Sequence, residues 1–498
     1  MSYLNPEGNL SAFEEVVPSA ARVHGLSRSS ILTARRRART IPQSGMNFGT
    51  AGANGGASQI QTLIADQGGL VDMRSIVFNF FGLTTGTSGA VSCLDDGHPF
   101  TTVQILLNGQ LLENLQNACK VANIETKLGA SQTYYKTAGS FQGYELLNTD
   151  LALAPTQNKW GNVAQTVTDI AARQQKAASV QANNLAGSPR SIPLSSFSGL
   201  GRMKQYLPIS LLGELQFIFI TGNAGEVVFN PYTAVATATA GDYSLSAVNC
   251  TYDVVIPDPR YSAVLQKLAS DPSEGGLMLP FESTICTSGA QINSSVAALS
   301  ETSIIVSRAT SHLLRTSLVL IPPTAVQSTA WPSQSCFSHA GVWSYQNRIG
   351  SMTYPQLPAQ GDADIFNLAL EAYGSASQEN GSCVNRQTWG VSTGLTSTQA
   401  VPTIYESTQL AATATASSNG SGVIYAYADS FIPSYGFRTV KGAAEELDVD
   451  GVNLSAASGS QLITTIVAAP PANYVPYVSL VALKFITCQG GAVSIRGA

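Results

Sequence analysis

The run of residues that most resembles a binding site is Asp95-Asp96-Gly97-His98-Pro99. Two carboxylates beside an imidazole are side chains that can bind a cation. Asp and Gly are also preferred in turns for backbone reasons, and we favour a turn here. A second run, Asp448-Val449-Asp450-Gly451, resembles the start of a calcium loop. It lacks the glutamate that such a loop requires further along, so we predict a turn there as well.

Other signs of catalysis are weak in the sequence. The chain has only four histidines, which are far apart: His24, His98, His312 and His339. It contains no H-E-x-x-H pair, no P-loop lysine after a glycine and no G-x-S-x-G turn. A carboxylate pair that cleaves glycans cannot be located from sequence alone. We therefore predict that the protein is not an enzyme and uses no cofactor or metal.

A cluster of arginines near the N-terminus is the third group that could do chemistry. It consists of Arg22, Arg28, Arg35, Arg36, Arg37 and Arg39. A glycine-rich run from 43 to 59 follows and is typical of a linker. Guanidinium groups in series suit contact with phosphates. We predict that residues 1–60 form an extended arm that reaches genomic DNA or the inner surface of an assembly. A solvated tail and an arm threaded under a neighbouring subunit are the alternatives.

The composition points to a protein whose surface is covered by partners. Of 498 residues, 44% are hydrophobic and 11% are charged, whereas roughly 25% are charged in an ordinary globular domain. A surface with so little charge favours self-association. The net charge of −5 argues against a generally basic nucleic-acid binder, although not against a local basic arm.

The seven cysteines are scattered and form no C-x-x-C pair. We therefore expect reduced thiols that pack as small apolar groups, made in a reducing compartment. We see no signal peptide pattern and no apolar run of about 18 residues, so we expect no membrane span. N-x-S/T sequons occur at Asn9, Asn249, Asn293, Asn380, Asn419 and Asn453. A chain rich in Ser and Thr produces such sequons by chance.

The stretch from Leu207 to Leu268 organises the chain. It contains a strand at 215–220, a second strand at 243–256, a Pro-Asp-Pro break and an amphipathic helix at 261–268. In the first strand, Phe217 and Phe219 share one face and Ile218 and Ile220 the other, because side chains alternate. Since both faces are apolar, we expect this strand to be covered on both sides.

Both halves of the chain read as strand-rich with a short helix. In the first half we predict strands at 76–81 and 101–107, the latter closed by the turn pair Asn108-Gly109, and helices at 110–122 and 167–182. In the second half we predict strands at 277–281, 303–308, 317–321, 423–427, 461–468 and 477–486, with a helix at 364–373 that Gly374 ends. The two halves fit two copies of one fold whose sequences have diverged.

Three segments carry a resemblance to a known family. They are Ile192-Pro193-Leu194, the run from Leu207 to Leu215, and Tyr252-Asp253-Val254-Val255-Ile256 before the linking helix. The segment 428–437, with 451–454 beyond it, also looks like final strands of that family. The body from about residue 60 resembles the double jelly-roll major capsid proteins of double-stranded DNA viruses, such as polinton-like viruses, virophages and nucleocytoplasmic large DNA viruses.

The resemblance implies an all-β fold of two consecutive antiparallel eight-stranded jelly rolls, with short helices in the loops and an extended N-terminal arm. We expect the arm at 1–60, the first jelly roll at 61–256, a linker helix at 257–275 and the second jelly roll at 276–498. It also implies a major capsid protein that self-assembles as pseudo-hexameric homotrimers into an icosahedral shell around double-stranded DNA. Its partners would be neighbouring trimers, penton and minor capsid proteins. It would be located in the virion capsid, after assembly inside the host cell.

A β-sandwich that binds glycans, or an adhesive surface or fibre protein, is the alternative. The sequons and the loops that bear Tyr and Trp suit this alternative, whereas the arginine arm and the missing signal peptide favour the capsid protein.

Overall fold

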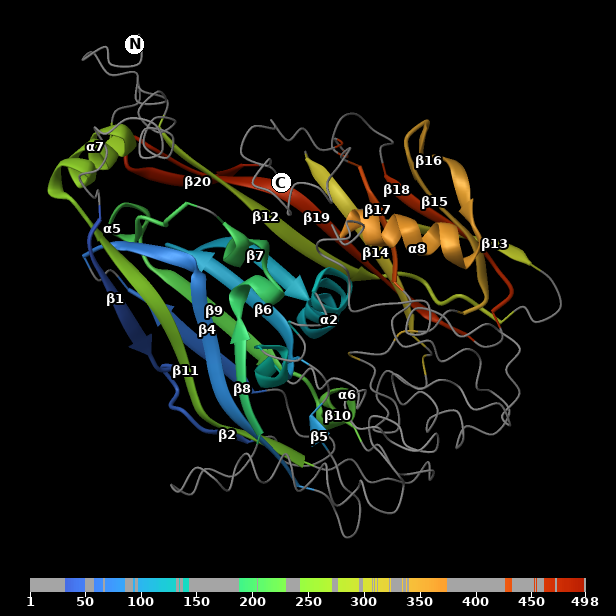
Figure 1. Cartoon of the computed structure of the whole chain (residues 1–498), viewed down its shortest axis with the longest axis horizontal. Coiled ribbons are helices and arrows are strands. Elements are labelled where there is room, and N and C mark those ends of the chain that lie inside the picture. Colours follow the sequence, from blue (N-terminus) through green and yellow to red (C-terminus); the bar gives the residue numbers. More distant parts are fainter. Residues whose placement is uncertain are drawn as a thin grey trace.

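The computed structural model places two β-sandwiches side by side along the long axis of the molecule (Figure 1). The structure describes residues 32–49, 58–65, 68–85, 93–94, 97–130, 138–142, 188–203, 205–229, 242–270, 276–294, 299–306, 312–321, 340–373, 426–431, 461–470 and 473–496, with single residues 134, 308, 310, 323, 334, 337, 452 and 454. The predicted helix at 167–182 and the predicted turn at 448–451 therefore lie outside the described residues.

The first sandwich packs two antiparallel sheets against each other. We call them sheet A and sheet B. Sheet A has the order β1 (Leu32–Thr40), β11 (Asp242–Pro257), β4 (Leu70–Thr85) and β8 (Ser188–Pro193), with β2 (Phe48–Gly49) also paired to β11. Sheet B has the order β3 (Gln59–Ile64), β9 (Leu215–Thr221), β6 (Phe100–Leu107) and β7 (Gln110–Gln116). A small pair, β5 (Cys93–Leu94) with β10 (Val228–Phe229), lies apart from these sheets.

The second sandwich also packs two antiparallel sheets against each other, and we call them sheet E and sheet G. Sheet E has the order β12 (Leu277–Ser288), β19 (Val475–Gln489), β14 (Leu313–Ile321) and β17 (Ala426–Ser430), with β20 (Ala492–Arg496) paired to β19. Sheet G has the order β13 (Ser300–Val306), β18 (Leu462–Ala468), β15 (Val342–Ile349) and β16 (Met352–Gln360).

The two sandwiches have the same strand order. If the eight main strands of each are counted along the chain, one sheet is ordered 1-8-3-6 and the other 2-7-4-5 in both cases. This is the order of a jelly roll, in which two Greek keys interleave. A smaller feature also repeats, because an isolated bridge joins strand 3 to a later loop in both halves: Val71 to Leu207 and Leu313 to Val452. The predicted fold of two consecutive antiparallel jelly rolls is therefore confirmed.

Short helices lie in the connections between strands. They are α2 (Ala118–Gly129), η3 (Ala138–Gln142), η4 (Leu194–Ser196), η5 (Gly199–Arg202), α5 (Ile209–Leu212), α6 (Ala224–Val227), α7 (Pro259–Ser270) and α8 (Gly361–Ala372). The first long helix, α2, follows the fifth main strand of the first sandwich, and α8 follows the fifth main strand of the second. Helix α7 connects the sandwiches, and the backbone of Gly276, at φ +80°, turns the chain into β12.

The predicted helix at 110–122 is wrong in its first half. Residues 110–116 form β7, which pairs with β6 across a tight turn in which Asn108 and Gly109 both have positive φ. Such a turn matches the twist of the flanking strands and forces a hairpin. Asn117, at φ 55°, then redirects the chain into α2. The leucines at positions 111, 112 and 115 fit a helix as well as a strand, and the hairpin turn at Asn108-Gly109 favours the strand.

The N-terminal arm is shorter than expected. Residues 32–40 form β1, which pairs along its length with β11, and residues 48–49 pair with β11 as well. A run of arginines reads as solvated chain, but every second residue on an edge strand can point to solvent while the backbone is paired. Residues 1–31 lie outside the described part. The other predicted domain limits remain predictions.

The inner face of β9 is buried as expected, but its outer face is less covered than expected. Phe217 and Phe219 are fully buried, and their rings pack edge-on against Phe78. Ile218 and Ile220 are only half-buried. By contrast, β14 of sheet E is buried along its whole length. Cys119, Cys250, Cys286 and Cys488 are buried. Among the described helices, none is long and apolar enough to cross a bilayer.

Candidate assembly surfaces

His98, the centre of the run that most resembled a binding site, lies in the core. Its ring stacks on Phe100 and contacts Phe197 edge-on, and its Nδ1 accepts a hydrogen bond from the backbone N–H of Phe100 at 3.2 Å. Burial lowers the pKa of His98 to about 3, so the imidazole is neutral at physiological pH. Asp95 and Asp96 lie outside the described residues. Within the described ranges, no group of three His, Cys, Asp or Glu side chains could hold a metal ion.

The two sandwiches share apolar contacts through α2. Ala118 and Ala122 of this helix pack in the core of the first sandwich. Val121, Ile124 and Leu128, on another face of the same helix, pack in the core of the second. Helix α2 thus lies between the two sandwiches, and because it is buried on two faces it fixes their relative position. We call this contact region between the sandwiches the junction.

A buried ionic network lies beside α2 at the junction. Glu125 of α2 accepts hydrogen bonds from Arg202 of η5, at 3.1 Å, and from Arg315 of β14. Burial opposes ionisation of Glu125, but the two arginines outweigh it and hold its pKa below the ordinary value. The Arg315 guanidinium also lies 4.3 Å from the ring centroid of Tyr373, at the end of α8. This network connects elements of both sandwiches.

A second polar contact crosses the same junction. Glu113 of β7 accepts hydrogen bonds from the hydroxyl of Ser198 and from the backbone N–H of Thr284 in β12, the latter at 2.6 Å. Burial raises the pKa of Glu113 to about 7. Lys484 of β19 faces this carboxylate, and burial lowers the pKa of its ammonium. At Gly199 of η5, a Cβ would lie 2.2 Å from the backbone oxygen of Glu282, so β12 and η5 are in close contact.

The structure shows toward which face of sheet A the arginines of β1 point. Arg35 forms an ion pair with Asp253, and Arg37 donates to Thr251 Oγ1 at 3.2 Å, both on the outer face of sheet A. Ala38, on the other face, packs against the first core. Alternation therefore places Arg35, Arg37 and Arg39 outward in one row and Arg36 on the opposite side. Arg22 and Arg28 lie outside the described residues, so their part in the predicted site stays a prediction.

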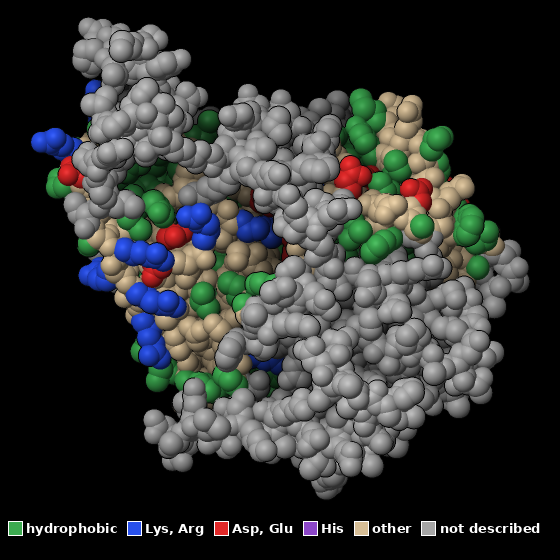
Figure 2. Space-filling model, viewed as in Figure 1, with side chains coloured by type: hydrophobic (Ala, Val, Ile, Leu, Met, Phe, Trp, Pro, Cys, Tyr) green, Lys and Arg blue, Asp and Glu red, His purple; other side chains and the backbone are tan. Residues whose placement is uncertain are grey.

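Lys and Arg side chains gather on the side of the molecule where β1 and β11 lie (Figure 2). Arg74 of β4 is also exposed, to 51%, and its Nε lies 3.3 Å from Asp72. The two acids of this face, Asp72 and Asp253, have exposures of only 15% and 9%, so arginines cover them. The outer face of sheet A is therefore basic.

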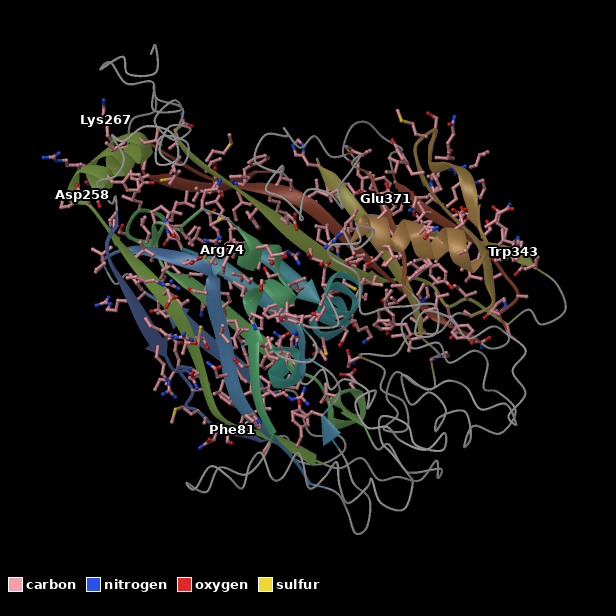
Figure 3. All side chains as sticks on the ribbon, in the orientation of Figure 1. Arg74, Phe81, Asp258, Lys267, Trp343 and Glu371 are labelled. Atoms are coloured by element: carbon pink, nitrogen blue, oxygen red, sulfur yellow. The ribbon has the colours of Figure 1, made fainter. Side chains whose placement is uncertain are left out.

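The far end of the molecule has a different surface. Trp343 of β15 (Figure 3) and Ile305 of β13 are exposed to 53% and 57%. The alternation of burial along β13 and β15 places both on the outer face of sheet G. Met352 and Leu357 of β16 are exposed to 63% and 80%. Exposed apolar side chains gathered on one sheet are typical of a surface that contacts another protein.

Sequence reasoning did not find the junction. Glu113, Glu125, Arg202 and Arg315 are far apart in the chain, and no local spacing relates them. One signal was available: α2 carries apolar residues around more of its circumference than a surface helix needs, which indicates burial between two bodies.

No protein-family model matches the sequence, and no curated protein matches it. Solved structures do match. The PBCV-1 VP54 crystal structure, fitted into a cryo-EM reconstruction of the virophage Sputnik, aligns with a TM-score of 0.51 and 12% identity, covering 93% of this chain and 98% of that chain. The mavirus major capsid protein aligns with a TM-score of 0.50 and 11% identity, covering 95% and 92%. The Faustovirus major capsid protein aligns with a TM-score of 0.51 and 9% identity, covering 95% and 94%.

At these identities the likeness concerns the fold, and it extends over nearly the whole length of each chain. It agrees with the repeated strand order derived above. The protein has the fold of the double jelly-roll major capsid proteins.

Proposed function

We propose that the chain is a major capsid protein whose homotrimers tile an icosahedral virus shell around double-stranded DNA. The observation that carries the proposal is the repeat of one strand order in two sandwiches that are locked together. Three such chains related by a threefold axis present six similar sandwiches, and six-sided tiles fill a shell surface with one kind of contact. A structural role of this kind requires no catalytic site.

Two further features support self-association. The outer face of sheet B carries uncharged side chains at every half-buried position of β6 and β9: Thr101, Thr102, Gln104, Leu106, Gln216, Ile218 and Ile220. The outer face of sheet G exposes Trp343 and Ile305. The uncharged positions of sheet B lose little on desolvation, and the exposed apolar side chains of sheet G gain from being covered by a neighbouring protein.

The proposed location is the virion capsid, with synthesis and assembly inside the host cell. The proposed partners are other copies of the chain within and between trimers, together with penton and minor capsid proteins. The arginine segment, with Arg22 and Arg28 before β1, would contact genomic DNA, minor proteins or a neighbouring tile.

Electron microscopy of the expressed full-length chain tests this proposal. We expect closed shells or flat hexagonal arrays whose repeating unit has threefold symmetry and a six-lobed outline. A chain that stays dispersed as single molecules under all assembly conditions would contradict the proposal. Binding of those single molecules to a glycan array would favour the adhesive alternative.

A further inference from the structure

The contact inside one chain gives the geometry for a contact between chains. In the second sandwich the first strand, β12, is covered by β7 and η5 of the first sandwich. Helix α2 of the first sandwich packs at the same junction. In the first sandwich the equivalent strand is β1, and its outer face is exposed in the single chain. The elements equivalent to β7 and α2 are β16 and α8 of the second sandwich, where α8 packs on β17 and its end touches α2 (Figure 1).

Helix α8 has the same length and place as α2, so the two can be compared position by position. The fourth, seventh and eleventh residues of α2 are Val121, Ile124 and Leu128, which pack in the partner sandwich. The same positions of α8 are occupied by the exposed residues Asp364, Asn367 and Glu371. The fifth residue faces the helix's own sandwich in both cases, as Ala122 and Ile365 do. The face that is apolar and covered in α2 is therefore acidic and exposed in α8.

The surface equivalent to the α2 contact is basic in the first sandwich. Arg315 lies two residues after the bridge residue Leu313 and binds Glu125 of α2. Arg74 lies three residues after the corresponding bridge residue, Val71, and is exposed. Arg37 and Arg39 of β1 flank this position on the outer face of sheet A. Figure 3 places Arg74 and Glu371 on the two different sandwiches.

We propose that the basic face of β1 and β4 binds the acidic face of α8 on a second copy of the chain. The contact repeats, between copies, the arrangement that α2 and sheet E have within one copy. It rests on the proposed function, since it assigns the surfaces that close the trimer. Such a head-to-tail contact is heterologous and closes into a ring if the rotation per copy is a third of a turn. Arg37 and Arg39 then bind protein carboxylates, and the genome is not their main partner.

The charges account for how the chain stays soluble before assembly. An apolar α8 face like that of α2 would expose a sticky patch on every free chain, whereas acidic and basic faces are hydrated until they meet. Complementary charge also steers encounter and disfavours contact between like faces. Because these pairs lie at the rim of an interface, salt should weaken the contact.

A charge-swap series in the full-length chain tests the proposal by sedimentation equilibrium. R37E/R39E and D364R/E371R should each raise the dissociation constant of the trimer at least about tenfold, because like charges then face each other. The combined variant R37E/R39E/D364R/E371R should return the dissociation constant to within about threefold of wild type. R260E/R308E is the matched control, since it reverses two exposed arginines that lie outside β1, β4, α8 and the outer face of sheet G and should leave the trimer intact.

The outcomes separate this inference from the proposed function. If wild type forms trimers and shells but R37E/R39E leaves the dissociation constant unchanged, the inference is overturned and the shell role stands. A variant that keeps its trimer but loses retention of DNA in particles would assign the arginines to the genome and also overturn it. Failure of the combined variant to recover association would do the same. If wild type forms neither trimers nor arrays, the proposed function itself fails.

Discussion

The first strands of the two sandwiches occupy the same place in the same topology but differ in sequence and surroundings. β12 begins Leu-Met-Leu-Pro-Phe, and its residues Leu277, Leu279 and Phe281 pack in the core of the first sandwich. β1 reads Ala-Arg-Arg-Arg-Ala-Arg, and its outer face is exposed. The α2 and α8 helices differ in the same sense. Contacts that form once, within a folding chain, bury apolar side chains beside hydrogen-bonded polar groups. Equivalent positions left open in the free chain carry charge.

This difference follows from the cost of exposure. A junction within one chain is covered as soon as the chain folds, so burial of its apolar side chains stabilises the fold without an exposed stage. A surface that meets another copy must first exist in water, where charged side chains prevent indiscriminate association. The fold thus fixes where the junction within one chain and the contact between copies lie. The sequence determines that the junction is buried on folding and that the contact between copies forms afterwards.

The largest expected effect comes from giving α2 the character of α8. Val121→Asp places a carboxylate in the covered junction with no cation designed to meet it. We expect it to lower the free energy of unfolding by about 4 kcal/mol or more, because an unpaired buried charge is among the most destabilising changes. Chemical denaturation of the full-length chain measures this. The reciprocal change, Asp364→Val, should cost only about 1 kcal/mol, because it removes the hydrogen bond that Asp364 Oδ2 accepts from the backbone N–H of Gln360 at the start of α8. Equal effects of the two changes would show that the faces do not differ.

A slightly smaller effect separates the inner and outer faces of β9. Phe219→Ala removes a fully buried ring that packs on Phe78 and Phe100, and we expect a loss of about 3–5 kcal/mol. Ile218→Ala, on the half-buried outer face next in sequence, should cost about 1 kcal/mol in the single chain. Denaturation curves of both variants below the association concentration provide the measurement. A Phe219→Ala variant as stable as wild type would contradict the described core.

The smallest expected effect is a pH dependence of the junction. Glu113 has a pKa of about 7 in the folded chain against an ordinary value of 4.5. The folded state therefore holds this proton more tightly than the unfolded state, so the contribution of Glu113 to the free energy of unfolding falls as pH rises from about 4.5 to about 7. The total change in this contribution is at most about 3 kcal/mol. Glu125 acts in the opposite sense, because its lowered pKa makes stability fall as pH drops below about 4.5. Buried His98, whose pKa is lowered to about 3, also contributes a slope of opposite sign to that of Glu113, below about pH 6.5.

Glu113→Gln removes the contribution of Glu113, so the free energy of unfolding of wild type minus that of the variant should fall as pH rises from about 4.5 to about 7. Denaturation between pH 4.5 and 8 provides the comparison, with wild type measured in the same buffers. A difference in the free energy of unfolding between wild type and Glu113→Gln that stays constant across this range would contradict the assignment of the slope to Glu113.

The sequence predicted the strands with clear patterns and missed those whose role depends on distant partners. Leu215–Thr221 alternates cleanly between phenylalanine and isoleucine, and Asn108-Gly109 specifies its hairpin, so both were predictable from local chemistry. β1 was not, because an arginine run has no apolar period and becomes a strand only through pairing with β11. The division between the basic face of sheet A and the acidic face of α8 also needed the fold. Spacing along the chain does not show that two sandwiches repeat one strand order.

The molar mass of the purified chain, measured by light scattering across a range of salt concentrations, tests the central claim most directly. The account predicts a species of three times the 52.1 kDa chain at low salt, which dissociates as salt is raised. A chain that remains a 52.1 kDa monomer at every salt and protein concentration would contradict it.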